Sequence, residues 1–344
     1  MCYRTRYALR LDMLLTQRDL YHIATELNEV ISHMEDKPLK KIAVIDLGSN
    51  SVRMSIFDRT APAGALHTFR STIRLSQGMT VDGILKAEPQ MRAVNALLEY
   101  KRIITDEGVD TVCAVATAAV RKAKNQAEFL SLVNDLAGIK IQVIDGFAEA
   151  RLDSLAISRI LGCPDGVICD IGGGSTELIG ICDGRPPIIS IPHGCRGICE
   201  MFFAQGESPE LIKNAQAFAD KLVCNVDWLD NYKGAPLVGI GGTIHALAKF
   251  DLCHVDKSTI TKSRFSFKRM YEILNEVESA DINLRRQMPG IGAERADIIL
   301  GGIILLRAVL DRISPDKILV SDAGIREGVF FDLIENKGIL QWCE

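Results

Sequence analysis

Apolar and polar positions alternate along this chain in two ways, with a period of two in short runs and with helical spacing in longer segments. The two periods predict strands and amphipathic helices, respectively. In the first half of the chain, strands are predicted at 42–47, 52–57, 66–70, 111–116 and 141–144. Helices are predicted between them at 88–107, 126–137 and 147–160. This mixture predicts an α/β protein.

The opening of this order returns in the second half of the chain. Strands are predicted there at 166–171, 177–182 and 188–191, again joined by turns. Two halves with the same strand–turn–strand–turn–strand opening indicate an internal repeat and a cleft between the repeats. The change from one half to the other is expected between Glu149 and Pro164.

Each repeat carries the same short motif, in which an apolar run leads to Asp, an apolar residue, Gly and small polar residues. The motif runs from Asp46 to Ser51 in the first half and from Asp170 to Glu177 in the second. Glycine allows consecutive backbone N–H groups to face an anion and allows phosphate to approach closely. Two such turns facing each other predict a clamp for a phosphate chain, with Asp46 and Asp170 holding a divalent cation between them.

A third glycine turn, from Gly239 to Thr243, also follows an apolar run and precedes a helical pattern. Two common nucleotide-binding sequences are absent. No G-x-x-x-x-G-K-[ST] string occurs, which excludes a P-loop, and no G-x-G-x-x-G follows a first strand, which excludes a dinucleotide fingerprint.

The first 39 residues carry a separate amphipathic pattern that ends at Pro38, and we expect a helical extension that packs on the main body or on a partner. No continuous apolar core of a secretory signal precedes Lys41, so the cytoplasm is the expected location, with an organellar transit segment as the alternative. The longest apolar stretch, 298–310, contains Arg307 and is too short to cross a bilayer.

The length of 344 residues favours two domains, and the hydrophobic content of 47% fits a globular protein. The net charge of −4 gives no support for a general basic surface, so neither a nucleic-acid nor a membrane partner is expected. A local basic cluster, Lys262, Arg264, Lys268 and Arg269, is interpreted as a solvated helix face or as a lining for a long polyanion.

Ten cysteines are scattered along the chain and do not predict a disulfide scaffold. Cys113, Cys169 and Cys182 lie within or beside apolar runs and are expected to pack as small reduced side chains. His193, Cys195 and Cys199 lack a fourth ligand and a second C-x-x-C pair, which favours ordinary packing over zinc.

Together these motifs resemble the exopolyphosphatase / guanosine pentaphosphate phosphohydrolase family, within the superfamily of actin, sugar kinases and heat-shock ATPases. The two glycine turns carry the resemblance most specifically. Further matching positions, in chain order, are Arg74 with Gly78, Ala116 to Arg121, Glu149 to Arg151, Pro289 with Gly290, Glu294 to Asp297, and Ser321 to Gly328. The similarity runs from about residue 41 to about residue 335.

The resemblance implies two actin-like (ribonuclease H-like) domains with the active site in the cleft between them. We expect the helical extension at 1–39, domain I at 40–152, domain II at 153–335 and a tail at 336–344. A return of the last helix to domain I is left open. Long members of the family add a C-terminal helical domain, and this sequence, which stops at Glu344, resembles the short form. Dimers are common in the family, so a homodimer is expected.

The resemblance also implies release of terminal orthophosphate from linear polyphosphate, or of the 5′ γ-phosphate from guanosine pentaphosphate, with Mg²⁺. We expect the first activity, which the basic cluster favours slightly. Two other classes stay as rivals: an ATP-dependent phosphotransferase and a non-catalytic nucleotide sensor. No insertion can be assigned to an acceptor pocket, and a sensor would not need the carboxylate of Glu149.

Glu149 occupies the family's catalytic glutamate position and is expected to be the general base, the alternative being a first-turn glutamate that complements the helix dipole. Arg121 is expected to contact phosphate, the alternative being a structural ion pair. The expected Mg²⁺ ligands are Asp46, Asp170 and Glu177. The expected phosphate donors are Gly48, Ser49, Asn50, Ser51, Gly172, Gly173, Gly174 and Ser175, with Gly242 and Thr243 for more distal phosphates.

Overall fold

The structure is a computed structural model that describes residues 40–60, 64–79, 82–162, 165–182, 185–252 and 263–341. The helix predicted within residues 1–39 lies outside the described residues, as do Lys262, the tail beyond residue 341 and the turn at Asp183. The described elements belong to the compact unit that begins at Lys41.

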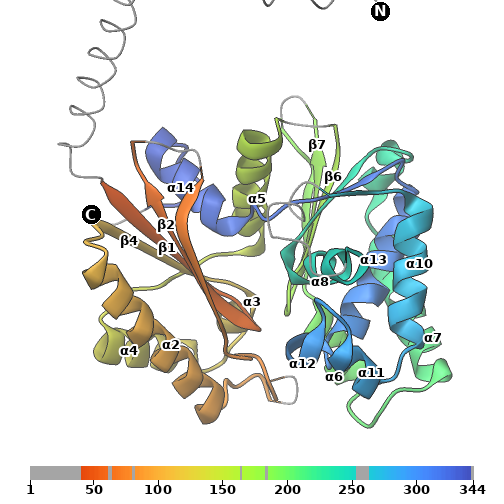
Figure 1. The fold of residues 1–344 in the computed structure, drawn as a ribbon, viewed down its shortest axis with the longest axis horizontal. Coiled ribbons are helices and arrows are strands. Elements are labelled where there is room, and N and C mark those ends of the chain that lie inside the picture. Colours follow the sequence, from red (N-terminus) through yellow and green to blue (C-terminus); the bar gives the residue numbers. More distant parts are fainter. Residues whose placement is uncertain are drawn as a thin grey trace, which may run out of the picture. The chain divides into compact units, whose positions relative to one another are not determined.

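Two β-sheets organise this unit (Figure 1). The strands of the first sheet are β1 (Lys41–Leu47), β2 (Ser51–Asp58), β3 (Ala65–Thr72), β4 (Thr111–Ala116) and β5 (Gln142–Val143). The strands of the second sheet are β6 (Gly166–Ile171), β7 (Thr176–Ile181), β8 (Ile188–Ile191), β9 (Leu237–Ile240), β10 (Arg264–Phe265) and β11 (Ile318–Val320).

Helices surround both sheets. Those from the first half of the chain are α2 (Ala87–Asp106), α3 (Ala118–Arg121), α4 (Gln126–Ala137) and α5 (Gly146–Leu161). Those from the second half are α6 (Cys195–Phe202), α7 (Pro209–Cys224), the 3₁₀ helix η1 (Asp227–Tyr232), α8 (Gly241–Asp251), α10 (Phe267–Ser279), α11 (Ile282–Gln287), α12 (Gly292–Arg295), α13 (Ile299–Ile313) and α14 (Ile325–Glu335).

The two sheets share one topology. Within the described residues, the first sheet has the order β3-β2-β1-β4-β5, and the second has the order β8-β7-β6-β9-β11-β10. β1 pairs antiparallel with β2 and parallel with β4, and β6 pairs in the same two ways with β7 and β9. The predicted internal repeat is therefore confirmed, and the fold is the predicted actin-like α/β fold with two sheets.

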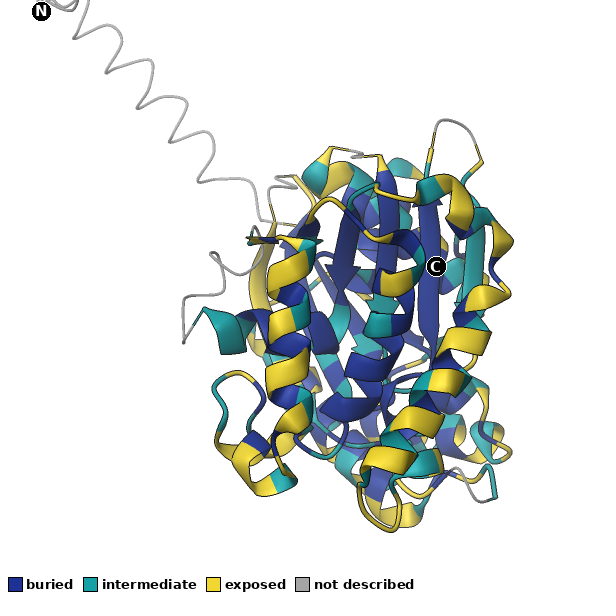
Figure 2. Cartoon of the chain, turned by 90° about the vertical axis from the view of Figure 1, so that its right-hand side faces the viewer, coloured by how far each residue is buried: buried dark blue, intermediate teal, exposed yellow. Residues whose placement is uncertain are grey.

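Each sheet is buried by helices, as the apolar pattern of the central strands requires. One face of the first sheet is covered by α2 and α4, through side chains such as Leu97 and Phe129. α13 is buried along most of its length beside the second sheet, which accounts for the long apolar stretch in the sequence. In Figure 2 the strands are mostly buried, and the exposed residues lie mostly on the outer helices.

α5 lies between the two sheets and packs against both. Its Leu152 belongs to a core cluster with β1 and α14, whereas Ala156 and Ile157 pack against β6, β7 and β9. The last helix, α14, packs on the first sheet, where Phe330 stacks on Phe57 with 4.5 Å between ring centroids. α5 therefore packs between the two sheets, and α14 packs against both α5 and the first sheet.

Most predicted elements are confirmed within one or two residues, and 111–116, 126–137, 166–171 and 188–191 match as predicted. The strand predicted at 141–144 is shorter, because it pairs only along Gln142 and Val143. The prediction for Cys182 was wrong: this side chain lies just beyond the end of β7 and is exposed. Across the described residues, no helix combines the length and hydropathy needed to span a bilayer.

Candidate active site

The two glycine turns have the same backbone shape. The N–H of Gly48 donates to the carbonyl oxygen of Ser51 at 3.1 Å, and the N–H of Gly172 donates to that of Ser175 at 3.0 Å. The turns also pack against each other, because a Cβ on Gly173 would lie only 2.9 Å from the Cβ of Ser49. Only glycine permits this approach. The turns therefore face each other, as the sequence predicted.

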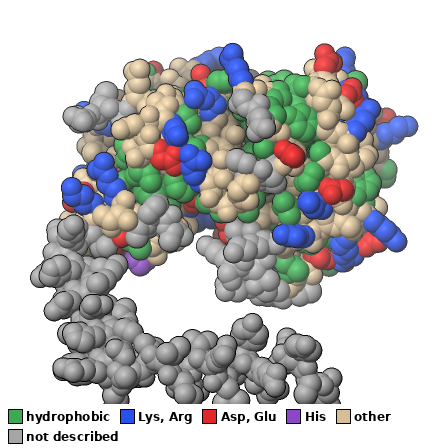
Figure 3. All heavy atoms as spheres, turned by 90° about the horizontal axis from the view of Figure 1, so that it is seen from above, with side chains coloured by type: hydrophobic (Ala, Val, Ile, Leu, Met, Phe, Trp, Pro, Cys, Tyr) green, Lys and Arg blue, Asp and Glu red, His purple; other side chains and the backbone are tan. Residues whose placement is uncertain are grey.

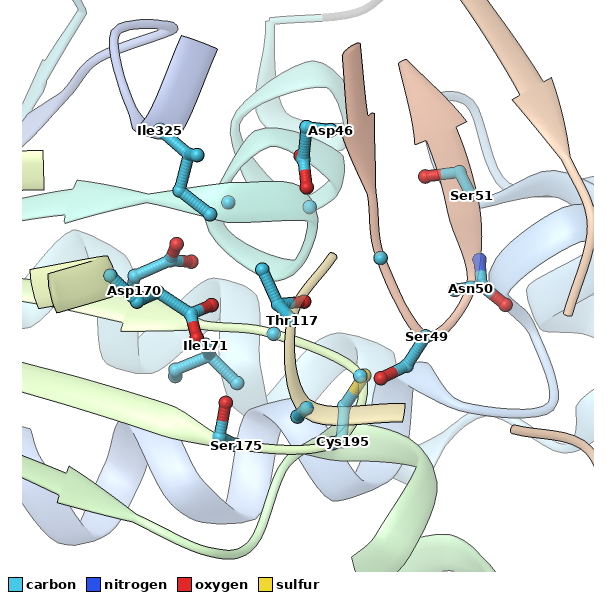
Figure 4. A pocket seen from close by; sticks show the side chains of 18 of the residues that line it. Asp46, Ser49, Asn50, Ser51, Thr117, Asp170, Ile171, Ser175, Cys195 and Ile325 are labelled. Carbon is cyan, nitrogen blue, oxygen red and sulfur yellow. The ribbon is translucent and has the colours of Figure 1, made fainter. Parts of the chain in front are cut away.

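A cavity of about 90 Å³ lies between the turns. Most of the predicted site residues line it, namely Asp46, Gly48, Ser49, Asn50, Ser51, Glu149, Asp170, Gly172, Gly173, Gly174, Ser175 and Gly242. Figure 4 shows Asp46 and Asp170 on different walls of this cavity, with Thr117 between them in the view. Residues far apart in the sequence thus form one site.

Three predicted residues do not line this cavity: Arg121, Glu177 and Thr243. Thr243 is buried beneath α13, where a Cβ on Gly302 would lie 2.4 Å from its Oγ1. Glu177 is fully buried and lies opposite Asp170 on the neighbouring strand, and one of its oxygens accepts from the hydroxyl of Ser190 at 2.7 Å.

Glu149 is held in place by the start of α5. Asp145 caps this helix, its Oδ1 accepting from the N–H of Ala148 at 2.7 Å, and this places Glu149 in the first turn. The side chain is 5% exposed, and its Oε2 accepts from Nη1 of Arg121 at 3.0 Å. The same Nη1 donates to the carbonyl oxygen of Ile144 at 2.8 Å. Arg121 therefore positions Glu149 and does not face the cavity itself.

Burial and like charge raise the pKa values of the carboxylates around the cavity. Desolvation raises the pKa of Asp170 to about 6, and desolvation together with the charge of Asp170 raises the pKa of Glu177 to about 7. The pKa of Glu149 is raised well above its ordinary value by burial first and by Glu177 second, while Arg121 opposes the shift.

Several carboxylate oxygens around the cavity are buried and unpartnered. Among the described residues, Asp46 Oδ1, Asp170 Oδ1, Glu177 Oε2 and both oxygens of Asp153 accept no hydrogen bond. No three His, Cys, Asp or Glu side chains of the described ranges lie close enough to hold a metal ion by themselves. One or two of these unpartnered carboxylates still fit a hard cation like Mg²⁺, because Mg²⁺ takes one or two carboxylates and completes its shell with water and substrate oxygens.

Asp153 was missed by sequence reasoning. It is fully buried, follows Glu149 by one helical turn, and has its pKa raised by burial first and then by the nearby charges of Asp170 and Glu149. The signal in the sequence was its i+4 spacing from Glu149, which places both carboxylates on one face of α5.

Two arginines that line the cavity were also not predicted as site residues. Arg53 is the cross-strand partner of Asp46, the position that Glu177 occupies relative to Asp170 in the second repeat. Arg295 reaches the cavity beside Gly242, where a Cβ would lie 2.0 Å from its Nη2. Burial lowers the pKa of Arg295 to about 10, so this side chain still carries its charge at neutral pH.

A second, basic cavity of about 190 Å³ adjoins the first and shares Arg53, Gly242 and Arg295 with it. Its other lining residues include Arg70, Lys249 and Arg326. The basic cluster singled out in the sequence lies elsewhere. Within that cluster, Arg269 pairs with Asp251 and with Glu272, and Arg264 and Arg269 line a separate cavity around Phe265.

The cysteine cluster packs as predicted. Cys195 and Cys199 are free and buried on α6, and Cys199 Sγ accepts from the N–H of Gly301 at 3.2 Å. Cys195 also lines the cavity between the turns. No metal-binding group of His and Cys occurs in the part of the chain that the structure describes.

Two sheets of one topology, each presenting a glycine turn to a shared cavity, define the class as an actin-like enzyme fold with a site between its repeats. The chain belongs to the Ppx/GppA phosphatase family, whose sequence model matches residues 38–337. This membership makes it a phosphoric anhydride hydrolase, as the sequence predicted.

Solved structures of similar proteins agree with this assignment. An exopolyphosphatase from Cytophaga hutchinsonii is 23% identical with a TM-score of 0.82, and the match covers 88% of this chain and 100% of that one. The Ppx/GppA family member of Aquifex aeolicus is 29% identical with a TM-score of 0.70, covering 87% and 99% of the two chains. A structure described as the Aquifex aeolicus PPX-GPPA enzyme is 30% identical with a TM-score of 0.69, covering 87% and 100%.

Proposed function

We propose that this chain releases terminal orthophosphate from linear inorganic polyphosphate, with a water molecule activated by Glu149 and with Mg²⁺ that would be held by one or two of the carboxylates Asp46, Asp170 and Glu177 together with substrate oxygens. The observation that carries the proposal is a buried carboxylate, held by one arginine, in a cavity built from both glycine turns. The unpartnered oxygens of the three carboxylates support the choice of cation.

In the proposed mechanism, the turns bind the terminal phosphoryl group through backbone N–H groups and the hydroxyls of Ser49 and Ser175. Glu149 accepts the proton of the attacking water. The water oxygen bonds to the terminal phosphorus, the bond to the bridging oxygen breaks, and that oxygen keeps the electron pair on the shortened chain. Arg53 and Arg295 offset the charge on the equatorial and leaving oxygens. A bound Mg²⁺ supplies further neutralisation of phosphate charge.

The deprotonated form of Glu149 has to be available for this role. Burial and Glu177 favour its protonated form, whereas the hydrogen bond and charge of Arg121 favour the carboxylate. Cation binding at Asp170 and Glu177 would remove part of the like charge that raises the pKa of Glu149. Arg121 therefore acts as the positioning residue of the proposed base.

The basic cavity beside the site supports polyphosphate as the substrate. Arg53 and Arg70 reach it from β2 and β3, Arg295 from α12 and Arg326 from α14. These arginines and Lys249 outnumber the two acidic lining residues, Asp322 and Glu327, and such a lining suits several consecutive phosphates. Guanosine pentaphosphate is the second candidate, because its terminal phosphates would meet the same turns. The ranking of the two substrates is a matter for the assay.

The test is orthophosphate release from short and long polyphosphate and from guanosine pentaphosphate, with and without Mg²⁺. In Glu149→Gln, kcat is expected to fall by about 10²–10⁴-fold. The matched control is Glu128→Gln, the same change in the first turn of α4 at an exposed position outside the cavity linings. Full activity in Glu149→Gln, or no release from any substrate by folded protein, would contradict the proposal.

A further inference from the structure

Two buried donors beside the first glycine turn have no acceptor. Among the described residues, Nδ2 of Asn50 and Nε of Arg196 are buried and make no hydrogen bond. The two side chains touch, because Nη2 of Arg196 donates to Oδ1 of Asn50 at 2.8 Å. They are 8% and 5% exposed, respectively. Because unmet buried donors are costly, their pairing beside the site indicates that an acceptor belongs there.

A second cationic group, Lys122, approaches the same region from the end of α3 in the first repeat. Nζ of Lys122 donates to the carbonyl oxygens of Gly174 at 2.5 Å and Pro192 at 2.9 Å. Nη1 of Arg196 lies 3.7 Å from Oδ2 of Asp297, which offsets part of its charge. Because these two hydrogen bonds of Lys122 go to uncharged main-chain oxygens, its ammonium keeps its net charge and can still attract an anion.

Lys122 and Arg196 line a cavity of about 270 Å³ on this side of the turns. This cavity shares Ser49, Ala118, Gly173 and Gly174 with the central one. The basic cavity adjoins the central one through different residues, namely Arg53, Gly242 and Arg295. The site between the turns is therefore flanked by two separate cationic spaces.

The two spaces differ in chemistry. The side of Arg53 and Arg295 gathers many basic groups, which suits a polyanion. The side of Arg196 carries Lys122 and Arg196 together with apolar Met79 and Met201, and Glu200 also lines it. This smaller charge suits a single phosphate dianion rather than an extended chain.

We propose that Asn50, which lines the central cavity, forms with Arg196 and Lys122, which line the adjoining one, a subsite for the orthophosphate product where the two cavities meet. Its donors are Nδ2 of Asn50, Nε of Arg196 and Nζ of Lys122, while the remaining chain is held on the side of Arg53 and Arg295. The inference rests on the proposed function for the origin of this anion. It gives the bound chain a direction, with its terminal phosphate towards Arg196. It also gives the product a route away from the site that does not require release of the chain.

The subsite is tested with inorganic orthophosphate alone, by isothermal titration calorimetry, and then by product inhibition of hydrolysis. Arg196→Met and Lys122→Met are expected to weaken orthophosphate binding and to raise its inhibition constant, each by about tenfold, since each removes a charge-assisted contact. KM for polyphosphate is expected to change less than about threefold. Arg295→Met is expected to raise KM for polyphosphate and to leave orthophosphate binding nearly unchanged.

Arg312→Met serves as the matched control, because Arg312 is also paired with a carboxylate, Asp230, at 2.7 Å but lines none of these three cavities. Arg196→Lys keeps the charge near Asp297 and removes Nε, so it separates loss of the subsite from loss of folding. Thermal unfolding of each variant reports whether the protein is intact. Lys122→Met, which breaks bonds to carbonyl oxygens only, gives an independent variant.

Orthophosphate binding that is absent in the wild type, unchanged in both Arg196→Met and Lys122→Met, or lost equally in Arg295→Met would overturn the subsite. Failure of the proposed function looks different. If the wild type hydrolyses no polyphosphate but binds orthophosphate through Arg196, the subsite stands and the function does not. If the wild type hydrolyses polyphosphate and Arg196→Met binds orthophosphate as tightly as the wild type does, the function stands and the subsite does not.

Discussion

Glu149 and Arg121 come from different helices and meet at 3.0 Å, with the carboxylate buried and the guanidinium only partly exposed to solvent. The hydrogen bond to Ile144 fixes the guanidinium on one side, so the carboxylate has a defined direction. The same hydrogen bond that orients Glu149 also lowers its pKa, so Arg121 both positions the carboxylate and favours its charged form.

At this residue scale, Arg121→Met is expected to lower kcat and to move the acidic limb of the kcat/KM profile to higher pH. Arg121 lowers the pKa of Glu149, so its removal raises that pKa and keeps the base protonated to a higher pH. Arg121→Lys keeps the charge and should shift the limb less. The measurement is a pH–rate profile of the three proteins, with Arg312→Met as control. An acidic limb that stays in place would argue against Glu149 as the titrating base.

At the scale of elements, the β6–β7 hairpin places Asp170 and Glu177 directly opposite each other. Like charges at such a position destabilise a strand pair, and burial adds to the cost. Burial, with a smaller contribution from Asp46, raises the pKa of Asp170 to about 6, and burial together with the facing charge of Asp170 raises the pKa of Glu177 to about 7. When both carboxylates are charged, their burial and mutual repulsion therefore lower the stability of the folded hairpin.

The metal-free protein is expected to lose stability as pH rises from about 4 to about 7. The folded pKa values of both groups lie above their ordinary 3.8 and 4.5, so the native state binds more protons than the unfolded state in this window. The contribution of these two groups to the free energy of unfolding is then fully present below their ordinary pKa values, and it is lost as pH rises through their raised pKa values. Urea unfolding in EDTA at several pH values measures the slope, and Mg²⁺ should reduce it.

Glu177→Gln should flatten this pH dependence, because it removes one titrating group and the repulsion on Asp170. Glu128→Gln, at an exposed position, should leave the slope as in the wild type. A stability that is flat or rising from pH 5 to pH 7 in EDTA, or a slope equal in both variants, would contradict the interpretation of the buried carboxylates.

The start of α6 holds the second glycine turn. The N–H groups of Cys195 and Arg196 donate to the carbonyl oxygens of Gly172 and Gly173 at 2.9 and 3.0 Å. At Gly194 a Cβ would lie 2.5 Å from the oxygen of Gly172, so backbone meets backbone there. The shape of the turn thus depends on a close approach that a side chain would prevent.

Gly194→Ala is expected to destabilise the protein by about 1–3 kcal/mol and to reduce turnover, because α6 and the second turn have to separate. The matched control is Gly197→Ala on the same helix, where a Cβ would meet nothing within 4 Å. There alanine should stabilise by about 0.5–1 kcal/mol through helix propensity. Chemical unfolding and steady-state kinetics check both, and equal effects of the two changes would refute the proposed contact.

At the scale of the whole molecule, ion pairs join the two repeats across the site. Arg74 donates to both oxygens of Asp297, at 2.8 and 3.3 Å, and Arg70 lies 3.2 Å from Glu294. Arg74 adopts a φ of 49°, a conformation that few non-glycine residues take. These contacts hold the repeats together beside the cavity, so under the proposed function they would have to loosen when a chain of phosphates enters.

Arg74→Glu is expected to increase amide hydrogen exchange in the segments around Arg74 and Asp297 by roughly fivefold, the equivalent of about 1 kcal/mol for a partly exposed pair. Arg74→Lys keeps a cation beside Asp297 and should keep exchange slow, and Asp297 is left unchanged because it also pairs with Arg196. The pair Arg312–Asp230 has a similar length, 2.7 Å, but lies within the second repeat. Reversing Arg312 should leave the cleft segments unchanged, and exchange that is equally slow in all variants would show that the pair does not restrain opening.

The face of the molecule drawn in Figure 3 mixes basic, acidic and apolar side chains over its described surface. This agrees with the small net charge of −4. The positive charge of the molecule that matters for a phosphate ligand is instead concentrated in the cavities, at Arg53, Arg295 and their neighbours.

The sequence by itself determined the strands, most helices, the repeat and the two glycine turns, because periodicity and glycine requirements are local properties. It also brought Asp46, Glu149 and Asp170 to one expected site, and the structure gathers them there. Tertiary structure alone decided which buried charges meet. Arg53, Arg196 and Arg295 reach the site through strand pairing and packing across the cleft, whereas Arg269, in the densest basic run, is paired on the surface. The physical reason is that the role of a charged side chain depends on which groups lie near it in the folded structure, and the spacing of residues along the sequence does not specify those neighbours.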